Sequence, residues 1–222
     1  MKKTLALIAL AAPALAGTKT VVATVPAPAP TPAPAPIVSP WAIEVGTGYN
    51  FASKDLFKGV EDQKKVNTWG WDLTGVYKLD ENNALTLRLG YAYGSRKQDN
   101  DIRYKVNNWS LMPGYRYTYA LDDQWSLFAG VNVGVTNMKW RITGDFPAVE
   151  KSGWGFGYSA ELGVRYAINT NWDVFAAYQF SGSTATPKYT ETFDGQYGPE
   201  SVSTKAKAQN YHGVRIGVGY TF

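Results

Sequence analysis

The sequence predicts an all-β protein in which eight antiparallel strands close into an up-and-down barrel that spans a membrane. Three observations indicate this fold. Apolar and polar residues alternate in runs of about ten residues, which is the length that crosses a membrane as a tilted strand. Aromatic residues gather at the ends of these runs, and short turns alternate with long connections along the chain.

Each expected strand is bounded by clusters of turn residues. The strands cover 41–50, 67–79, 84–94, 104–119, 125–138, 153–168, 172–182 and 209–222. Short connections are expected at 80–83, 120–124 and 169–171, and long ones at 51–66, 95–103, 139–152 and 183–208. Membrane barrels have short turns on one side and long loops on the other, so both termini are expected on the side of the short turns.

The last strand shows the alternation most clearly, since Val214, Ile216 and Val218 share one face. The end of this strand also has a polar residue, a glycine two positions on, and aromatic residues in the third-last and last positions. These residues are Arg215, Gly217, Tyr220 and Phe222. With this signal the chain resembles bacterial outer-membrane β-barrels of the small, eight-stranded OmpA-like and OmpX-like type.

The resemblance implies a location in the cell outer membrane with both termini in the periplasm. It also implies contact with outer-membrane lipid and lipopolysaccharide, and insertion by the barrel assembly machinery, which would read the signal at the end of the chain. The four long connections would then face the medium, where they are the parts of the chain that could bind a surface ligand.

The first 40 residues predict two segments that precede the barrel. Lys2 and Lys3 come before an apolar run and the small residues Ala14 and Ala16, which is typical of a signal peptide over 1–16. Residues 17–40 are rich in proline and alanine and predict a disordered periplasmic leader with extended polyproline conformation. The barrel is expected over 41–222.

Charge and cysteine content exclude several classes of partner. Removal of Lys2 and Lys3 with the signal peptide leaves 22 − 2 = 20 basic residues against 18 acidic ones, so the net charge gives no reason to expect a nucleic-acid partner. The chain has no cysteine, which excludes a disulfide framework and thiolate metal ligands. No spacing of residues predicts a metal site or a cofactor.

Aromatic side chains are expected to form belts at both edges of the membrane, because amphipathic rings favour the headgroup level. The residues assigned to this girdle are Trp41, Trp69, Trp71, Trp109, Trp125, Trp154, Trp172 and Phe222. Trp140 is also expected near a strand end.

Charged residues of both signs are expected on the inner face of the strands. They are Glu44, Asp72, Arg88, Arg116, Glu161, Arg165 and Arg215. Isolated ions in a low-dielectric interior are costly, so mixed signs indicate a paired network. Such a network resembles the plugged interior of OmpA-like barrels and is expected to obstruct conduction, with a gated narrow pore as the alternative.

Two segments have local features of their own. Residues 53–60 are similar to a stretch that follows the first strand in a family of small putative porins. The alternative interpretation is an external loop that is anchored by Leu56 and Phe57. Pro113 lies in the middle of an expected strand and lacks a backbone N–H, so a bulge is expected there.

The sequence predicts no enzyme. His212 is the only histidine, and no spacing brings Ser201 or Ser203 against it as nucleophilic catalysis would require. The function we expect is a structural or surface-interaction role, adhesin-like and mediated by the external loops. A narrow porin is the first alternative, and an enzyme that modifies lipid A is the second.

Overall fold

A computed structural model of the chain describes residues 39–57, 65–97, 102–144, 147–195 and 198–222. The expected signal peptide and all but the last two residues of the expected leader lie outside these ranges. Across the described ranges, no helix has the length and apolar composition that crossing a bilayer as a helix would need. Residues 38–222 form one compact unit.

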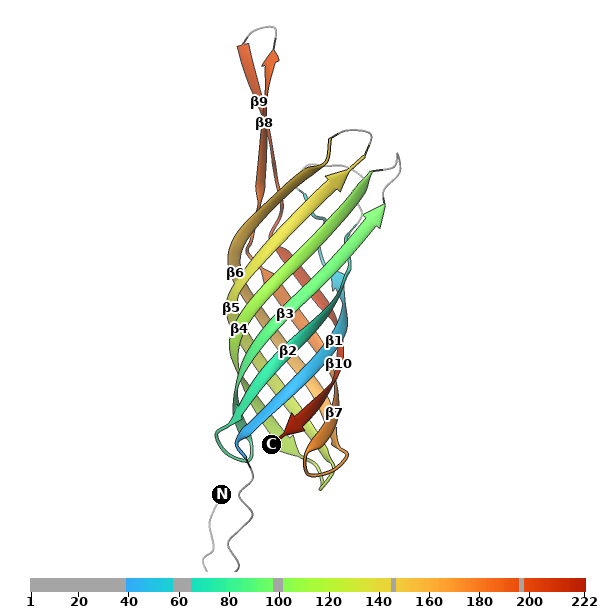
Figure 1. Cartoon of the computed structure of the whole chain (residues 1–222), viewed down its shortest axis with the longest axis vertical. Coiled ribbons are helices and arrows are strands. Elements are labelled where there is room, and N and C mark those ends of the chain that lie inside the picture. The colour runs from blue at the N-terminus through green and yellow to red at the C-terminus, as the bar shows by residue number, and fades with distance from the viewer. Residues whose placement is uncertain (1–38, 58–64, 98–101, 145–146, 196–197) are drawn as a thin grey trace, which may run out of the picture. The chain divides into compact units, whose positions relative to one another are not determined.

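The described chain contains ten strands. They are β1 (Trp41–Ala52), β2 (Thr68–Lys78), β3 (Asn83–Lys97), β4 (Arg103–Ala120), β5 (Trp125–Thr143), β6 (Val149–Ala167), β7 (Trp172–Ser183), β8 (Lys188–Gly195), β9 (Gly198–Lys205) and β10 (Gln209–Thr221). Eight of them close into an antiparallel barrel in the order β1-β10-β7-β6-β5-β4-β3-β2 (Figure 1). The predicted fold class is therefore confirmed.

Side chains alternate between the interior and the outer surface of the barrel. Along β2, the exposed side chains of Trp69, Trp71 and Leu73 alternate with the buried side chains of Asp72 and Thr74. Consecutive strand residues point to opposite faces, so one register decides which residues face inward throughout a strand.

Three tight turns join strands at the end of the barrel where β1 begins and β10 ends, and all three use the same hydrogen bonds. In each turn one side-chain oxygen accepts from the backbone N–H groups two and three residues ahead. The distances are 2.8 and 2.8 Å for Asp80, 2.8 and 2.7 Å for Asp122, and 2.9 and 2.8 Å for Asn169. Asp and Asn favour such turns because their side chains bond the backbone locally, and the repeat fixes the register of three hairpins.

Strands β3 to β6 extend into the predicted loops, so the predicted loop 139–152 is wrong over most of its length and the predicted loop 95–103 is wrong at 95–97 and 103. The extension of β5 carries Trp140 on the inner face, where this side chain is buried together with those of Tyr104 and Val106 near the start of β4. The alternation in the sequence continues through these segments. The strands were expected to end earlier because their outward residues become polar there.

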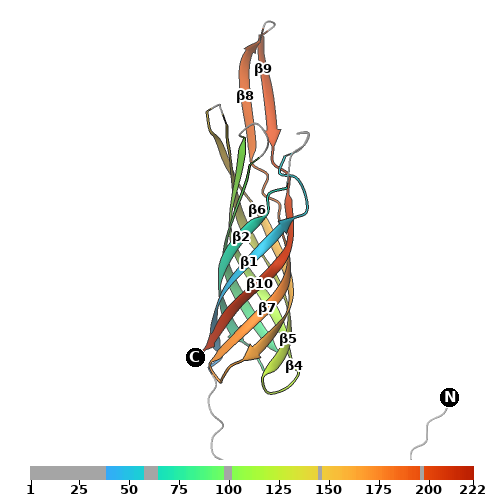
Figure 2. The ribbon, with the colours of Figure 1, turned by 90° about the vertical axis from the view of Figure 1, so that its right-hand side faces the viewer.

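The expected loop 183–208 is also wrong in part, because it contains the antiparallel hairpin β8–β9. Its register runs from Lys188 opposite Lys205 to Gly195 opposite Gly198. The hairpin extends from the end of the barrel opposite to the start of β1 and the end of β10. We call this end the mouth (Figures 1 and 2), and we call the other end, which holds the described terminal residues 39 and 222, the end of the termini. Its strands are eight residues each, too short for the alternation to stand out in the sequence.

The bulge expected at Pro113 is absent. Leu111 pairs with Val135 and Gly114 pairs with Asn132, so the register between β4 and β5 is the same on both sides of the proline. The pairing with β3 is continuous through Leu87 and Pro113. The missing N–H thus interrupts the ladder on the β5 side only, without inserting a residue.

Candidate functional site

Eight charged side chains meet inside the barrel and form what we call the ion-pair layer. They are Glu44, Asp72, Arg88, Arg116, Glu161, Arg165, Asp173 and Arg215. Every barrel strand except β5 contributes at least one of them. Four arginines face four carboxylates, so the formal charges of the layer sum to zero. The structure thus brings together all seven charged residues expected in the interior and adds Asp173.

The half of the layer nearer to the termini is built around Glu44. Its two carboxylate oxygens accept from the Arg116 guanidinium at 2.5 and 2.9 Å. Arg165 also donates to Glu44 and, through one nitrogen, to both oxygens of Asp173 at 2.8 and 2.9 Å. Glu44 is only 1% exposed. Two guanidinium groups therefore offset the cost of burying this carboxylate.

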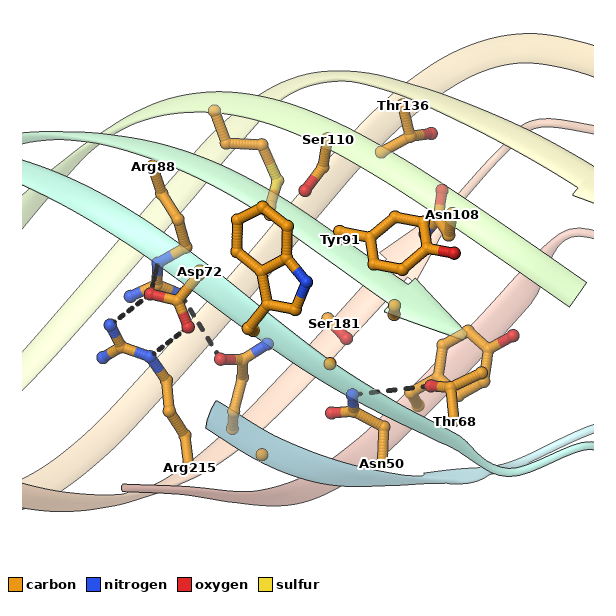
Figure 3. Close-up of a pocket in the computed structure, with 18 of the residues that line it drawn as sticks. Asn50, Thr68, Asp72, Arg88, Tyr91, Asn108, Ser110, Thr136, Ser181 and Arg215 are labelled. Carbon is orange, nitrogen blue, oxygen red and sulfur yellow. Dashed lines mark hydrogen bonds and ion pairs between the residues drawn. The ribbon is translucent and has the colours of Figure 1, made fainter. Parts of the chain in front are cut away.

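The half of the layer nearer to the mouth contains two more ion pairs. Arg88 donates to Glu161 at 2.6 Å, and Arg215 donates to Asp72 at 2.5 and 2.8 Å. Figure 3 shows Asp72 between Arg88 and Arg215. The two halves are joined because Arg116 lies 3.3 Å from Glu161 as well as bonding Glu44.

Sequence reasoning missed two aromatic rings that pack against the layer. Phe128 and Phe175 meet edge to face with their centroids 6.2 Å apart. The guanidinium of Arg215 lies 4.4 Å from the centre of the Phe175 ring, and that of Arg116 lies 5.0 Å from the centre of the Phe128 ring. Such contacts favour a cation over a ring face.

Strand parity could have identified these missed residues. Asp173 and Phe175 have the inward parity of β7, and Phe128 has the inward parity of β5. The interior was expected to hold charged residues, and no aromatic residue was assigned to it. The rings fit because glycines lie next to them: a Cβ on Gly163 would lie 2.6 Å from the Phe128 ring, and one on Gly217 would lie 2.3 Å from the Phe175 ring.

Two cavities lie on opposite sides of the ion-pair layer. The cavity toward the termini has a volume of 600 Å³ and ends at Glu44, Arg116, Arg165 and Asp173. The cavity toward the mouth has a volume of 90 Å³ and is lined by Asp72, Arg88 and Arg215 together with polar side chains (Figure 3). No residue lines both cavities. The layer therefore separates them.

A second group of side chains is buried near the mouth, and we call it the mouth cluster. It consists of Leu56, Phe57, Val66, Tyr104, Val106, Met138, Trp140, Ala185 and Ala206. The rings of Phe57 and Trp140 meet edge to face at 4.9 Å, and Trp140 is 1% exposed. Trp140 thus lies near the end of β5, as expected, but faces the interior.

The segment 53–60 contributes to the mouth cluster. Leu56 and Phe57 are both 2% exposed within the mouth cluster. The backbone holds them in place, since Lys207 N–H donates to the Leu56 carbonyl at 2.8 Å and Phe57 forms an isolated bridge with Ala206. Residues 58–60 of this segment lie outside the described ranges.

The residues assigned to the aromatic girdle all lie on the outer surface of the barrel. Their exposed fractions run from 41% for Trp71 to 75% for Trp154. Several contact rings on neighbouring strands at a tilted angle, as in the pairs Trp41 with Tyr77 and Trp125 with Tyr166. The assignment of these residues to the edges of a membrane remains a prediction.

The residues of the expected assembly signal fall on both faces of β10. Arg215 belongs to the ion-pair layer and Gly217 lies against the Phe175 ring. Tyr220 and Phe222 point outward, with their rings 5.2 Å apart and Phe222 62% exposed. The outward aromatic pair is therefore open to contact from outside the barrel, and its reading by an assembly machinery remains a proposal.

His212 lies on the outer surface between aromatic rings. Its ring stacks on Phe51 at 5.5 Å and lies 6.3 Å from Tyr178. The side chains of Ser201 and Ser203 lie outside the description. In the described part of the chain, no group of three His, Asp or Glu side chains could hold a metal ion.

Comparison with known proteins adds a family and a fold. The profile of the outer membrane protein beta-barrel domain matches residues 4–222. The match to the crystal structure of Neisserial surface protein A (NspA) covers 83% of this chain and 99% of the NspA chain, with a TM-score of 0.55 and 11% sequence identity. OprG from Pseudomonas aeruginosa covers 83% of this chain and 97% of its own, with a TM-score of 0.50 and 14% identity. These identities show the fold alone, and no curated protein sequence matches.

Proposed function

Because the chain belongs to the outer membrane protein beta-barrel family, we propose that it is a non-conducting barrel of the outer membrane that acts at the cell surface. One observation supports this proposal: two groups of packed side chains lie in series along the lumen. The ion-pair layer closes it between the two cavities, and the mouth cluster closes it again at the end opposite to the termini.

The ion-pair layer makes a poor path for ions. An ion that crosses it would have to displace guanidinium–carboxylate bonds such as those between Arg88 and Glu161 and between Arg116 and Glu44. An eight-stranded barrel has an interior that its own side chains can fill. Breaking one buried pair typically costs about 3–5 kcal/mol, which favours a structural role for the layer.

The surface role rests on the parts that extend beyond the mouth. In the proposed orientation the three tight turns and both termini lie in the periplasm, while the ends of β3 to β6 and the hairpin β8–β9 face the medium. These parts replace the loops 95–103, 139–152 and 183–208 as the proposed surface for a ligand, and Leu56, Phe57 and Val66 of the segment 51–66 lie beside them.

A planar-bilayer recording tests the closed lumen. The wild-type protein should show no conductance steps. Trp140→Ala should also remain silent, since the ion-pair layer still closes the lumen, and Glu161→Ala should remain silent because the mouth cluster is intact. The double variant should conduct. Steps from the wild-type protein would support the narrow channel instead.

An epitope tag tests the orientation separately. A tag inserted between Gly195 and Gly198 should bind antibody on intact cells, whereas a tag in the turn after Asp80 should bind only after the outer membrane is opened. The reverse pattern would overturn the orientation. Mass analysis of lipid A with and without the gene tests the enzymatic alternative, for which we expect no difference.

A further inference from the structure

The cavity toward the termini has a wall of small apolar side chains. This cavity is the larger of the two that flank the ion-pair layer, and its volume of 600 Å³ lies in the range of cavities that bind small molecules. Ala42 on β1, Val76 on β2 and Ala84 on β3 are buried together along its wall. A ligand with a small apolar body can therefore pack against this side of the cavity.

Two cations flank Ala84 in one cross-strand row. Lys78 on β2 pairs with Ala84 on β3, which in turn pairs with Arg116 on β4. All three residues line the cavity. Neighbouring strands lie about 4.8 Å apart, so the backbones of Lys78 and Arg116 are about 10 Å apart. The only side chain between them in this row is the methyl group of Ala84.

Both cations have a donor that is not used in an ion pair. The ammonium group of Lys78, which is partly buried, donates to the Thr221 hydroxyl at 3.2 Å. No carboxylate of the described part of the chain forms an ion pair with it. Arg116 is 2% exposed, and its Nε is buried without a hydrogen-bond partner in that same part. The row thus presents two donors that lack an acceptor of opposite charge.

The acidic residues around the cavity are either paired or at its rim. The two carboxylates at its inner end are bonded to arginines of the ion-pair layer, as described above. Asp80 and Glu81 lie on the exposed turn between β2 and β3. Four carboxylates and three cations line the cavity, so its net charge does not select an anion. An anionic group is favoured locally, beside Lys78, and a positive group is favoured at the rim.

The span from Lys78 to this rim matches a peptide of about three residues. Asp80 and Glu81 follow Lys78 by two and three positions, so their backbones lie at most about 7 and 10 Å from it. An extended peptide of three residues spans about 10 Å. The small residues of the apolar wall leave room for side chains of methyl size.

We infer that the cavity toward the termini binds short peptides with small side chains. The terminal carboxylate of the peptide lies over Ala84 and accepts hydrogen bonds from Lys78 Nζ and Arg116 Nε, while the amino group lies near Asp80 and Glu81. Charge-assisted hydrogen bonds are about twice as strong as neutral ones, so the carboxylate determines the affinity. The orientation proposed above decides only that such peptides come from the periplasm.

Titration of trialanine against the protein in lipid nanodiscs tests this site, because both ends of the barrel are open to solution there. NMR relaxation of the peptide methyl groups reports the bound fraction. Two further probes isolate the ends of the peptide: trialanine amide lacks the carboxylate, and N-acetyl-trialanine lacks the amino group.

Four variants separate charge from space. Lys78→Gln removes the charge and Lys78→Arg keeps it. Ala84→Leu leaves both cations in place but fills the space over which the carboxylate lies. Lys54→Gln is the matched control, since it removes an exposed cation beyond the other end of β1.

We expect trialanine amide to bind the wild-type protein about tenfold more weakly than trialanine. Lys78→Gln should weaken trialanine binding by a similar factor, because either change removes one charge-assisted hydrogen bond. Lys78→Arg should stay within about threefold of wild type, and Lys54→Gln within about twofold. Ala84→Leu should weaken binding about tenfold by overfilling the site. N-acetylation should weaken binding about two- to threefold, because the rim acids are exposed.

Equal binding of trialanine and its amide would overturn the inference, as would equal losses in Lys78→Gln and Lys54→Gln, or no binding of trialanine to the wild-type protein. Tighter binding after acetylation would overturn the peptide as the ligand and indicate an organic acid without an amino group. Heat-modifiable mobility on gels checks that each variant folds. If Lys78→Gln does not fold, Ala84→Leu tests the site without a change of charge, and the comparison of trialanine with its amide needs no variant.

The outcome is separable from the other proposals. Peptide binding in nanodiscs does not depend on which way the barrel faces, whereas antibody access to the tag does. A failure of the peptide site would leave the closed lumen standing. Conductance of the wild-type protein would leave the peptide site standing, because Lys78 and Ala84 lie outside the ion-pair layer.

Discussion

Arg88 on β3 and Glu161 on β6 are 73 positions apart in the chain, yet their side chains meet at 2.6 Å in the centre of the barrel. The contact spans the lumen between strands that are not neighbours in the sheet. It therefore depends on closure of the barrel and on the register of both strands.

Removing Glu161 should destabilise the barrel strongly. Glu161→Ala removes the carboxylate that lies 2.6 Å from Arg88, 3.3 Å from Arg116 and 3.5 Å from Arg215. Loss of one partner of a buried pair typically costs about 3–5 kcal/mol, and urea unfolding in lipid vesicles measures this change. Lys54→Gln, at an exposed position, should change the free energy of unfolding by less than about 0.5 kcal/mol. Equal losses in both variants would show that the layer is not buried as described.

The tight turns should make stability depend on acidity. Backbone N–H groups lower the pKa of Asp122, and the Asn83 side chain with backbone N–H groups lowers the pKa of Asp80. A carboxyl whose pKa is lower in the folded state stabilises the fold above its unfolded value of about 3.9. This contribution is lost as the pH falls from there through the folded pKa.

Asn169 forms the same turn without a charge. Asparagine at the other two turns should therefore remove the dependence of stability on pH. In Asp80→Asn, Asp122→Asn, the turn bonds remain but the titrating groups are gone. The stability difference between wild type and this variant, measured by urea unfolding, should shrink as the pH falls below about 4. A difference that is constant with pH would contradict the role of the two carboxylates.

The outward pair Tyr220 and Phe222 should matter more for assembly than for stability. If an assembly machinery reads these rings, Phe222→Ala should lower the amount of protein in the outer membrane and leave unfolded chain in the periplasm. Phe180→Ala, which removes another exposed aromatic ring from the outer surface, serves as the control. Equal yields of the two variants would argue against a specific signal at Phe222.

Most of the barrel follows from strand parity, which is a local property of the sequence. Because parity assigns every second residue to one face, the seven inward charges could be predicted without knowing which of them meet. The individual partners could not, since the contact of Arg88 with Glu161 depends on closure of the whole sheet.

The mouth could not be predicted because two rules conflict there. In 139–143, which was expected to be a loop, the outward residues Lys139 and Arg141 are typical of a loop in water, whereas the inward residue Trp140 continues the strand pattern. The structure resolves the conflict in favour of the inner face, because the segment around Leu56 and Phe57 packs against it. That packing joins parts of the chain that are distant in sequence, and no local pattern reports it.

Spin labels on β5 test the closed lumen and the register most directly. Single cysteines can be introduced at Val131, Asn132 and Val133, because the chain has none of its own. Val131 and Val133 are 56% and 50% exposed on the outer surface, whereas Asn132 is 2% exposed and bonds Thr86 and Ser159 inside the barrel. Labels at the two valines should be relaxed by oxygen dissolved in the lipid. A label at Asn132 should be shielded both from oxygen and from a water-soluble nickel complex. Strong relaxation of that label by nickel would show a water-filled lumen and contradict the account.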